Sequence, residues 1–90
     1  MSNIRITEEK IKRMMRNAEQ TVYTAFGKCT IVAMKFENGF ILTASSACVD
    51  PANYDINLGA KYAREQIEHQ LWQLEGYALQ KAIHKAATEE

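Results

Sequence analysis

Apolar residues recur at helical spacing near the start of the chain. Ile11, Met14, Met15 and Ala18 lie one to four residues apart, and a helical period places them on one side of the backbone. Thr7 precedes them, and its hydroxyl is suited to capping the first backbone N–H groups of a helix. The pattern predicts a short amphipathic N-terminal helix.

Three runs rich in β-branched and aromatic residues follow, at residues 21–26, 29–36 and 40–46. Such runs favour strands. Asn38-Gly39 separates the second run from the third and is the dipeptide preferred in two-residue hairpin turns. Gly27-Lys28 joins the first run to the second in the same way. We therefore expect a three-stranded antiparallel β-meander.

A two-residue turn decides which side chains share a face of the sheet, because strand side chains alternate. It places Phe36 opposite Ile41. One predicted face then carries Tyr23, Ala25, Val32, Met34, Phe36, Ile41, Thr43 and Ser45, and the other carries Val22, Thr24, Phe26, Ile31, Ala33, Lys35, Phe40, Leu42 and Ala44. Both faces are largely apolar, which is unusual for a sheet with one side in water. We expect one face to pack on the helices and the other on a second subunit of a homo-oligomer.

The last forty residues have a helical pattern, with Ile67, Leu71, Leu74 and Ala78 at three- and four-residue spacing. Asp55 is placed to cap this helix. Gly76 either interrupts the helix or lets another backbone approach it closely. The elements predict an α+β fold in one domain, residues 1–90, with an N-terminal helix, the β-meander and a long C-terminal helix.

Charge narrows the choice of partners. Eleven Lys and Arg balance eleven Asp and Glu, so the formal net charge is zero. This balance argues against double-stranded DNA and a membrane surface as partners. No apolar run approaches the roughly 20 residues of a membrane span, and the first residues do not resemble a signal peptide. We expect a cytoplasmic protein.

Catalytic motifs are missing from the sequence. It contains no Gly-rich phosphate loop, no Gly-x-Ser-x-Gly and no His-Glu-x-x-His. His69 and His84 have the character of surface histidines. Cys29 and Cys48 fall opposite each other if the predicted hairpin extends that far, so a disulfide is geometrically conceivable, although a chain without a secretion signal favours reduced thiols. We expect no enzymatic activity, no cofactor and no metal site.

Residues 45–55 concentrate the polar chemistry of the chain. As structure, they predict a strand-to-helix connection with a turn at Pro51 and a cap at Asp55. As function, the hydroxyls, Asn53, Tyr54 and a helix N-terminus suit a small anionic ligand, because unpaired helix N–H groups attract phosphate. Two carboxylates, including Asp50, oppose this interpretation, and basic side chains in the following turns offset them.

The same segment carries a resemblance. The chain contains Asn38-Gly39-Phe40, then Ser46-Ala47-Cys48-Val49-Asp50-Pro51-Ala52-Asn53-Tyr54-Asp55, then Gly59 and Ala63, and then Trp72-Gln73-Leu74-Glu75-Gly76-Tyr77. In these residues it resembles a family of small proteins from tailed phages and prophages. The resemblance covers about residues 28–83. The chain departs from the family at Tyr54, where Phe is frequent, and at Ala44-Ser45, where Gly-Glu is frequent, so the family's ligand preference does not transfer directly.

The order of sheet, proline turn and long helix is also similar to the phage Thoeris anti-defence sponges. Those proteins assemble into oligomers and sequester cyclic ADP-ribose-type or cyclic oligonucleotide immune signals. The resemblance implies a non-enzymatic sponge acting in the host cytoplasm. Aromatic rings would stack on a base and cations would hold phosphates. The candidate ligand-binding residues are Phe40, Asn53, Tyr54, Lys61 and Arg64.

A second hypothesis is a phage structural or accessory protein, or an inhibitor that binds a host protein. Residues 72–77 would then be the contact surface, because they include Trp72 and Tyr77 and these residue types dominate interface hot spots.

Overall fold

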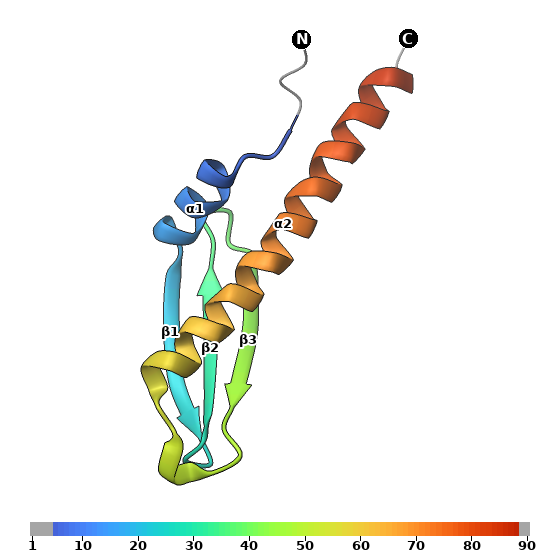
Figure 1. Ribbon diagram of the computed structural model, residues 1–90. Coiled ribbons are helices and arrows are strands. Elements are labelled where there is room, and N and C mark those ends of the chain that lie inside the picture. The colour runs from blue at the N-terminus through green and yellow to red at the C-terminus, as the bar shows by residue number, and fades with distance from the viewer. Residues whose placement is uncertain (1–4, 89–90) are drawn as a thin grey trace.

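The computed structural model describes residues 5–88. In chain order, the elements are the helix α1 (Glu8–Asn17), the strands β1 (Glu19–Ala25), β2 (Cys29–Lys35) and β3 (Ile41–Ala47), the short 3-10 helix η1 (Pro51–Asn53), and the helix α2 (Ile56–Thr88). Figure 1 shows this arrangement. It confirms the predicted α+β fold, with a helix at each end and an antiparallel sheet in sequence order between them.

Both helices begin where their capping residues predict. Thr7 accepts a hydrogen bond from the Lys10 N–H at 3.2 Å, and the Asp55 carboxylate accepts from the N–H groups of Asn57 and Leu58 at 2.9 and 3.3 Å. These side chains bond N–H groups that the first helical turn leaves without a partner. The helix α2 then runs without a break through Gly76, so that glycine does not interrupt it.

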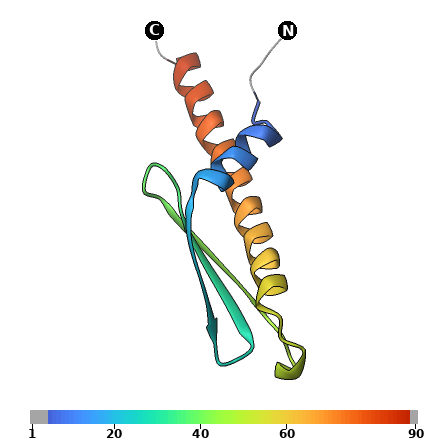
Figure 2. The ribbon, with the colours of Figure 1, turned by 90° about the vertical axis from the view of Figure 1, so that its left-hand side faces the viewer.

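The two helices pack on the same face of the sheet, and the opposite face is left open by the described residues (Figure 2). The core lies between the helices and the sheet. Its buried members are Ile11 from α1, Val32, Met34, Phe36 and Leu42 from the β2–β3 hairpin, and Ala60, Ala63, Ile67 and Leu71 from α2.

The turn between β2 and β3 has three residues, not the two that the sequence predicted. The Phe36 N–H donates to the Phe40 carbonyl at 2.9 Å, and the Gly39 N–H donates to the Phe36 carbonyl at 2.8 Å. Gly39 has a φ of 92°, whereas Asn38 keeps a negative φ and accepts the Phe40 N–H on its side-chain oxygen at 3.0 Å. A two-residue type I′ turn needs positive φ at both central residues, so that prediction is wrong.

This extra residue shifts the register by one and moves every β3 side chain to the other face. The β1–β2 turn makes the same shift, with positive φ at Phe26 and Gly27. The helix-covered face therefore carries Gln20, Val22, Thr24, Thr30, Val32, Met34, Leu42, Ala44 and Ser46, and the open face carries Thr21, Tyr23, Ile31, Ala33, Ile41, Thr43 and Ser45. The predicted faces were wrong, and the open face mixes apolar with hydroxyl side chains.

The shifted register also separates the cysteines. Cys29 lies opposite Ala47, and Cys29 and Cys48 are both free thiols. The opposed geometry on which a disulfide depended is therefore not formed.

The helix α2 is longer than the sheet that it covers. It has 33 residues, and its buried residues all fall between Gly59 and Leu71. The helix then passes α1 and the hairpin end of the sheet, where Trp72 and Leu74 lie. Its C-terminal part projects beyond the sheet and gives the molecule extents of 61 × 25 × 21 Å (Figure 1). Within residues 5–88, neither helix combines the length and the apolar character needed to cross a membrane.

Candidate functional site

The connection from β3 to α2 is a turn built around Pro51. The Asp50 carboxylate accepts the Ala52 N–H at 3.0 Å, and the Asp50 carbonyl accepts the Asn53 N–H at 2.9 Å. Proline starts such a turn because its ring fixes φ, and Asp50 before it is held in extended backbone. The turn reverses the chain at the foot of the sheet so that α2 can start back across it (Figure 1).

Tyr54 anchors the start of α2 to the sheet. Its hydroxyl lies 2.8 Å from Thr24 Oγ1 and 2.6 Å from Thr30 Oγ1, and Thr30 is fully buried. Gly59 packs directly over Thr30, where a Cβ on Gly59 would overlap Thr30 Oγ1 and lie 2.8 Å from Thr30 Cβ. Gly59 therefore lets α2 approach the sheet closely, and the hydrogen bonds of the Tyr54 hydroxyl stabilise this contact.

A hollow of about 160 Å³ lies at this corner, and we call it the η1 hollow. It is lined by Ser46, Ala47, Cys48, Asn53, Tyr54, Asp55, Leu58, Gly59 and Tyr62. Six of these residues belong to the motif run at 46–55, and the others come from the first two turns of α2. The motif therefore converges on one small site, which combines two aromatic rings, a thiol, a hydroxyl and an amide.

The helix N-terminus at this hollow is already occupied. The Asp55 carboxylate takes the N–H groups of Asn57 and Leu58, and the Cys48 thiol donates to the Asp50 carbonyl at 3.2 Å. Phosphate binding at helix starts depends on unpaired N–H groups. An anionic ligand here would therefore depend on cationic side chains instead.

The two candidate cations, Lys61 and Arg64, lie on α2 and do not line the η1 hollow. Lys61 Nζ lies 3.4 Å from Glu65 and 5.4 Å from the centre of the Tyr62 ring. Arg64 donates from Nη1 to Gln20 Oε1 at 3.2 Å, reaching back over β1. Arg64 thus bonds a neutral partner in β1, whereas Lys61 is paired with an acid of its own helix.

Phe40 lies elsewhere. It follows the β2–β3 turn at the opposite end of the sheet from η1 (Figures 1 and 2), where it lines a separate hollow of about 180 Å³. We call this second site the hairpin hollow, and it is lined by Met14, Phe36, Asn38, Phe40, Leu71, Leu74 and Glu75. The structure thus brings Asn53 and Tyr54 together, sets Lys61 beside the Tyr62 ring of the same hollow, and separates Phe40. It holds Arg64 on Gln20, near the opposite end of β1 from Thr24.

The sequence did not single out Tyr62 as a site residue. It lines the η1 hollow although it lies off the apolar stripe of α2. That position was the available signal, because an aromatic side chain off the core-facing stripe is free to border a surface site.

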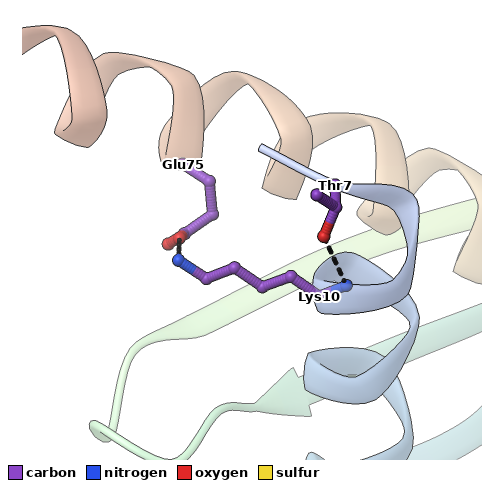
Figure 3. Close-up of polar contacts among 3 residues, drawn as sticks. All are labelled: Thr7, Lys10 and Glu75. Carbon is purple, nitrogen blue, oxygen red and sulfur yellow. Dashed lines mark hydrogen bonds and ion pairs between the residues drawn. The ribbon is translucent and has the colours of Figure 1, made fainter. Parts of the chain in front are cut away.

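The basic face of α1 is tied to α2. Lys12 lies 2.9 Å from Glu68, and this hydrogen-bonded carboxylate raises the pKa of Lys12. Lys10 lies 3.1 Å from Glu75, as Figure 3 shows together with the Thr7 cap. These lysines serve contacts between the helices, and within residues 5–88 no three His, Cys, Asp or Glu side chains gather to hold a metal ion.

These features define a small α+β protein with a motif-lined corner, and a comparison of sequences places it among phage proteins. A family model matches residues 3–83, and the chain belongs to the phage protein (N4 Gp49/phage Sf6 gene 66) family. Among curated proteins and among solved structures, nothing matches the chain significantly. The phage origin expected from the motifs is confirmed at the level of the family.

Proposed function

We propose that this phage protein is a sponge, which binds a cyclic ADP-ribose-type or cyclic oligonucleotide signal and withholds it from a host immune effector without turnover. The observation that carries the proposal is the convergence of the motif residues on the η1 hollow. Tyr54 and Tyr62 offer ring surfaces on which a base can stack, and Asn53 offers an amide that can donate and accept hydrogen bonds.

We expect cationic side chains, and not backbone N–H groups, to hold a phosphate of the ligand. Because Asp55 occupies the N–H groups at the start of α2, Lys61 and Arg64 are left to hold a phosphate. An arginine is suited to this task, since its planar fork matches two phosphate oxygens. Arg64 gives up only a bond to a neutral amide, Gln20, when it turns to a ligand.

The size of the hollow sets how much of the ligand one chain can hold. Its volume of about 160 Å³ is below the roughly 300–1,000 Å³ of pockets that enclose a drug-sized ligand. One chain therefore accommodates one part of such a signal, such as a single base.

Recovery of intact ligand tests the proposal. The purified protein is incubated with a panel of cyclic oligonucleotides and cyclic ADP-ribose isomers, freed of unbound compound, and denatured. We expect one compound to be released intact. Asn53→Ala should weaken its binding roughly tenfold, because the amide contributes about one hydrogen bond to a charged ligand, whereas Asn17→Ala at the end of α1 should not.

Two results would overturn the sponge. If no compound of the panel is released from the folded protein, the ligand class is wrong. If a compound is recovered chemically changed, the protein turns it over and is an enzyme.

A second candidate function is protein binding, and the hairpin hollow favours it. Phe40 is 51% exposed beside it, and Tyr77, 69% exposed, lies one turn further along α2 from Leu74, which lines it. Exposed aromatic residues beside an apolar hollow are typical of interaction surfaces. Tyr77→Arg should then abolish capture of a host protein and leave nucleotide binding unchanged.

A further inference from the structure

The two edges of the sheet are treated differently. On the β3 edge, the Gln66 side chain donates to the Ser45 carbonyl at 3.0 Å and the Gln70 side chain donates to the Thr43 carbonyl at 3.4 Å. On the β1 edge, no element of the described chain lies alongside the strand, and Figure 2 views the molecule from that side. An exposed strand edge is a template for pairing with another chain. The carbonyls of the β3 edge are thus capped by side chains of α2, whereas the β1 edge can pair with another strand.

The capped carbonyls identify the groups that β1 presents. The backbone carbonyls of Thr43 and Ser45 point away from β2, toward α2. The even-numbered residues of β3 are therefore those whose backbone groups bond β2, and the bond from the Phe36 N–H to the Phe40 carbonyl agrees with this alternation. Carried across the register to β1, this alternation directs the N–H and C=O groups of Gln20, Val22 and Thr24 outward.

We propose that a second copy of the chain pairs with β1 along this edge, antiparallel and centred on Val22, to give a continuous six-stranded sheet. Gln20 of each copy then lies opposite Thr24 of the other, and the two Val22 residues face each other. Three such pairs that exchange two bonds each supply about six backbone hydrogen bonds.

The occupant is a second copy because β1 is complementary to itself. Its one charged residue, Glu19, falls at the end of the pairing, opposite Ala25 of the other copy, so no like charges face each other. β1 is also accessible, since each of its residues is exposed or half-buried.

The pairing completes the ligand site, and this step rests on the proposed function. Arg64 is bonded to Gln20, and the Tyr54 hydroxyl is bonded to Thr24. Because Gln20 of one copy lies opposite Thr24 of the other, Arg64 of each copy is brought beside the η1 hollow of its neighbour. Each dimer then has two sites, in which one copy supplies Asn53 and Tyr54 and the other supplies Arg64.

Proline substitutions at matched edge positions test the pairing by light scattering after size exclusion. The wild-type protein should elute at about twice its 10.2 kDa chain mass. The Val22 N–H points outward, so Val22→Pro removes no bond within one chain and should yield folded monomer by circular dichroism. Thr43→Pro makes the same change on the capped β3 edge and should remain a dimer. A monomeric wild type, or a folded Val22→Pro dimer, would overturn the pairing.

A crosslink tests the register without proline. In chains that carry Cys29→Ser and Cys48→Ser, Thr21→Cys of one copy lies opposite Tyr23→Cys of the other, in a pair that does not share hydrogen bonds. The Cα atoms of such a pair are about 4.5 Å apart, within disulfide range. Oxidation should crosslink the two single variants when they are mixed. Crosslinking of either variant alone, in place of the mixture, would overturn the register.

Mixing two binding variants tests the shared site, with cyclic ADP-ribose as the probe. Arg64→Ala and Asn53→Ala should each bind it poorly, and their equimolar mixture, unfolded and refolded together, should recover about a quarter of the wild-type sites, since half of the dimers are mixed and one of their two sites is intact. A dimer that binds the probe and shows no recovery overturns the shared site. A dimer that binds no panel compound overturns the proposed function, while the pairing stands.

Discussion

The two halves of α2 are one continuous helix in two different environments. From Gly59 to Leu71 the helix packs against the sheet, and it provides four of the nine buried apolar residues of the core. Beyond Leu71 it has no fully buried residue within the described range. The projecting half is no less apolar than the packed half, so composition did not distinguish them. The difference arises because the strands are short, and the helix outlasts the surface that they offer.

The candidate binding site belongs to the packed half of α2. The η1 hollow, the Tyr54 anchor and both candidate cations belong to the packed half of the helix or to the segment just before it. This part of α2 packs on β2 and β3, and the side chains of Tyr54 and Arg64 bond Thr24 and Gln20 of β1. Fixed positions of this kind are what a binding site requires. The projecting half offers exposed side chains such as Tyr77 and Ile83, whose positions depend on the helix alone.

Two isoleucines give the largest contrast in stability. Ile67 is fully buried and Ile83 is 36% exposed. Ile67→Ala should lower the free energy of unfolding by about 2–5 kcal/mol, through lost burial and the cavity left behind. Ile83→Ala should change it by less than about 0.5 kcal/mol. Urea denaturation followed by circular dichroism measures both, and equal losses would mean that the projecting half is packed in solution.

Two glycines give a contrast of opposite sign. A Cβ on Gly59 would collide with Thr30, whereas a Cβ on Gly76 meets nothing within 4 Å. Gly59→Ala should cost about 1–3 kcal/mol in overpacking, and Gly76→Ala should gain up to about 1 kcal/mol because alanine favours the helix. Thermal unfolding of the two variants provides the measurement. A loss at Gly76 would indicate that another backbone approaches it.

Tyr54 and Tyr77 allow a hydrogen-bonded hydroxyl to be compared with an exposed one. Tyr54→Phe removes the hydrogen-bond partner of the buried Thr30 hydroxyl, and leaving a buried polar group unpaired costs roughly 1–3 kcal/mol. Tyr77→Phe alters an exposed ring and should be neutral within about 0.5 kcal/mol. The difference between their urea midpoints is the readout. A neutral Tyr54→Phe would show that Tyr54 does not hold α2 on the sheet.

The smallest effect is the pH dependence of the bridge between α1 and the packed half. Glu68 raises the pKa of Lys12 above its ordinary value of 10.5. The pair therefore stabilises the fold below pH 10.5, and its contribution is lost as the pH rises through the raised pKa. Glu68→Gln should flatten this alkaline loss, whereas Glu9→Gln, at the start of α1, should not. Both would be measured as urea midpoints against pH.

Much of the fold could be predicted because its signals are local. The caps at Thr7 and Asp55 act on N–H groups two or three residues away, and the strand runs are visible in composition. The register could not be predicted from the same signals. Asn38-Gly39 suits a two-residue turn, and the bond from the Phe40 N–H to the Asn38 side chain belongs to a turn one residue longer.

The candidate site was predictable in part for a related reason. Asn53 and Tyr54 lie next to each other in the sequence, so a motif placed them together. Phe40 was grouped with them as an aromatic residue of the family motif, and the hairpin carries it to the opposite end of the sheet. The bond between Arg64 and Gln20 spans 44 residues, so it depends on how the helix crosses the sheet and no local pattern reports it.

Hydrogen exchange with and without cyclic ADP-ribose tests most directly the claim that the packed half of α2 and the corner before it form the working site. In the free protein, the amides of residues 59–71 should exchange slowly and those of residues 77–88 rapidly, because only the former are held by tertiary packing. Bound ligand should slow exchange in residues 46–64 and leave residues 77–88 unchanged. Protection that appears in residues 72–88, with none in residues 46–64, would contradict the account.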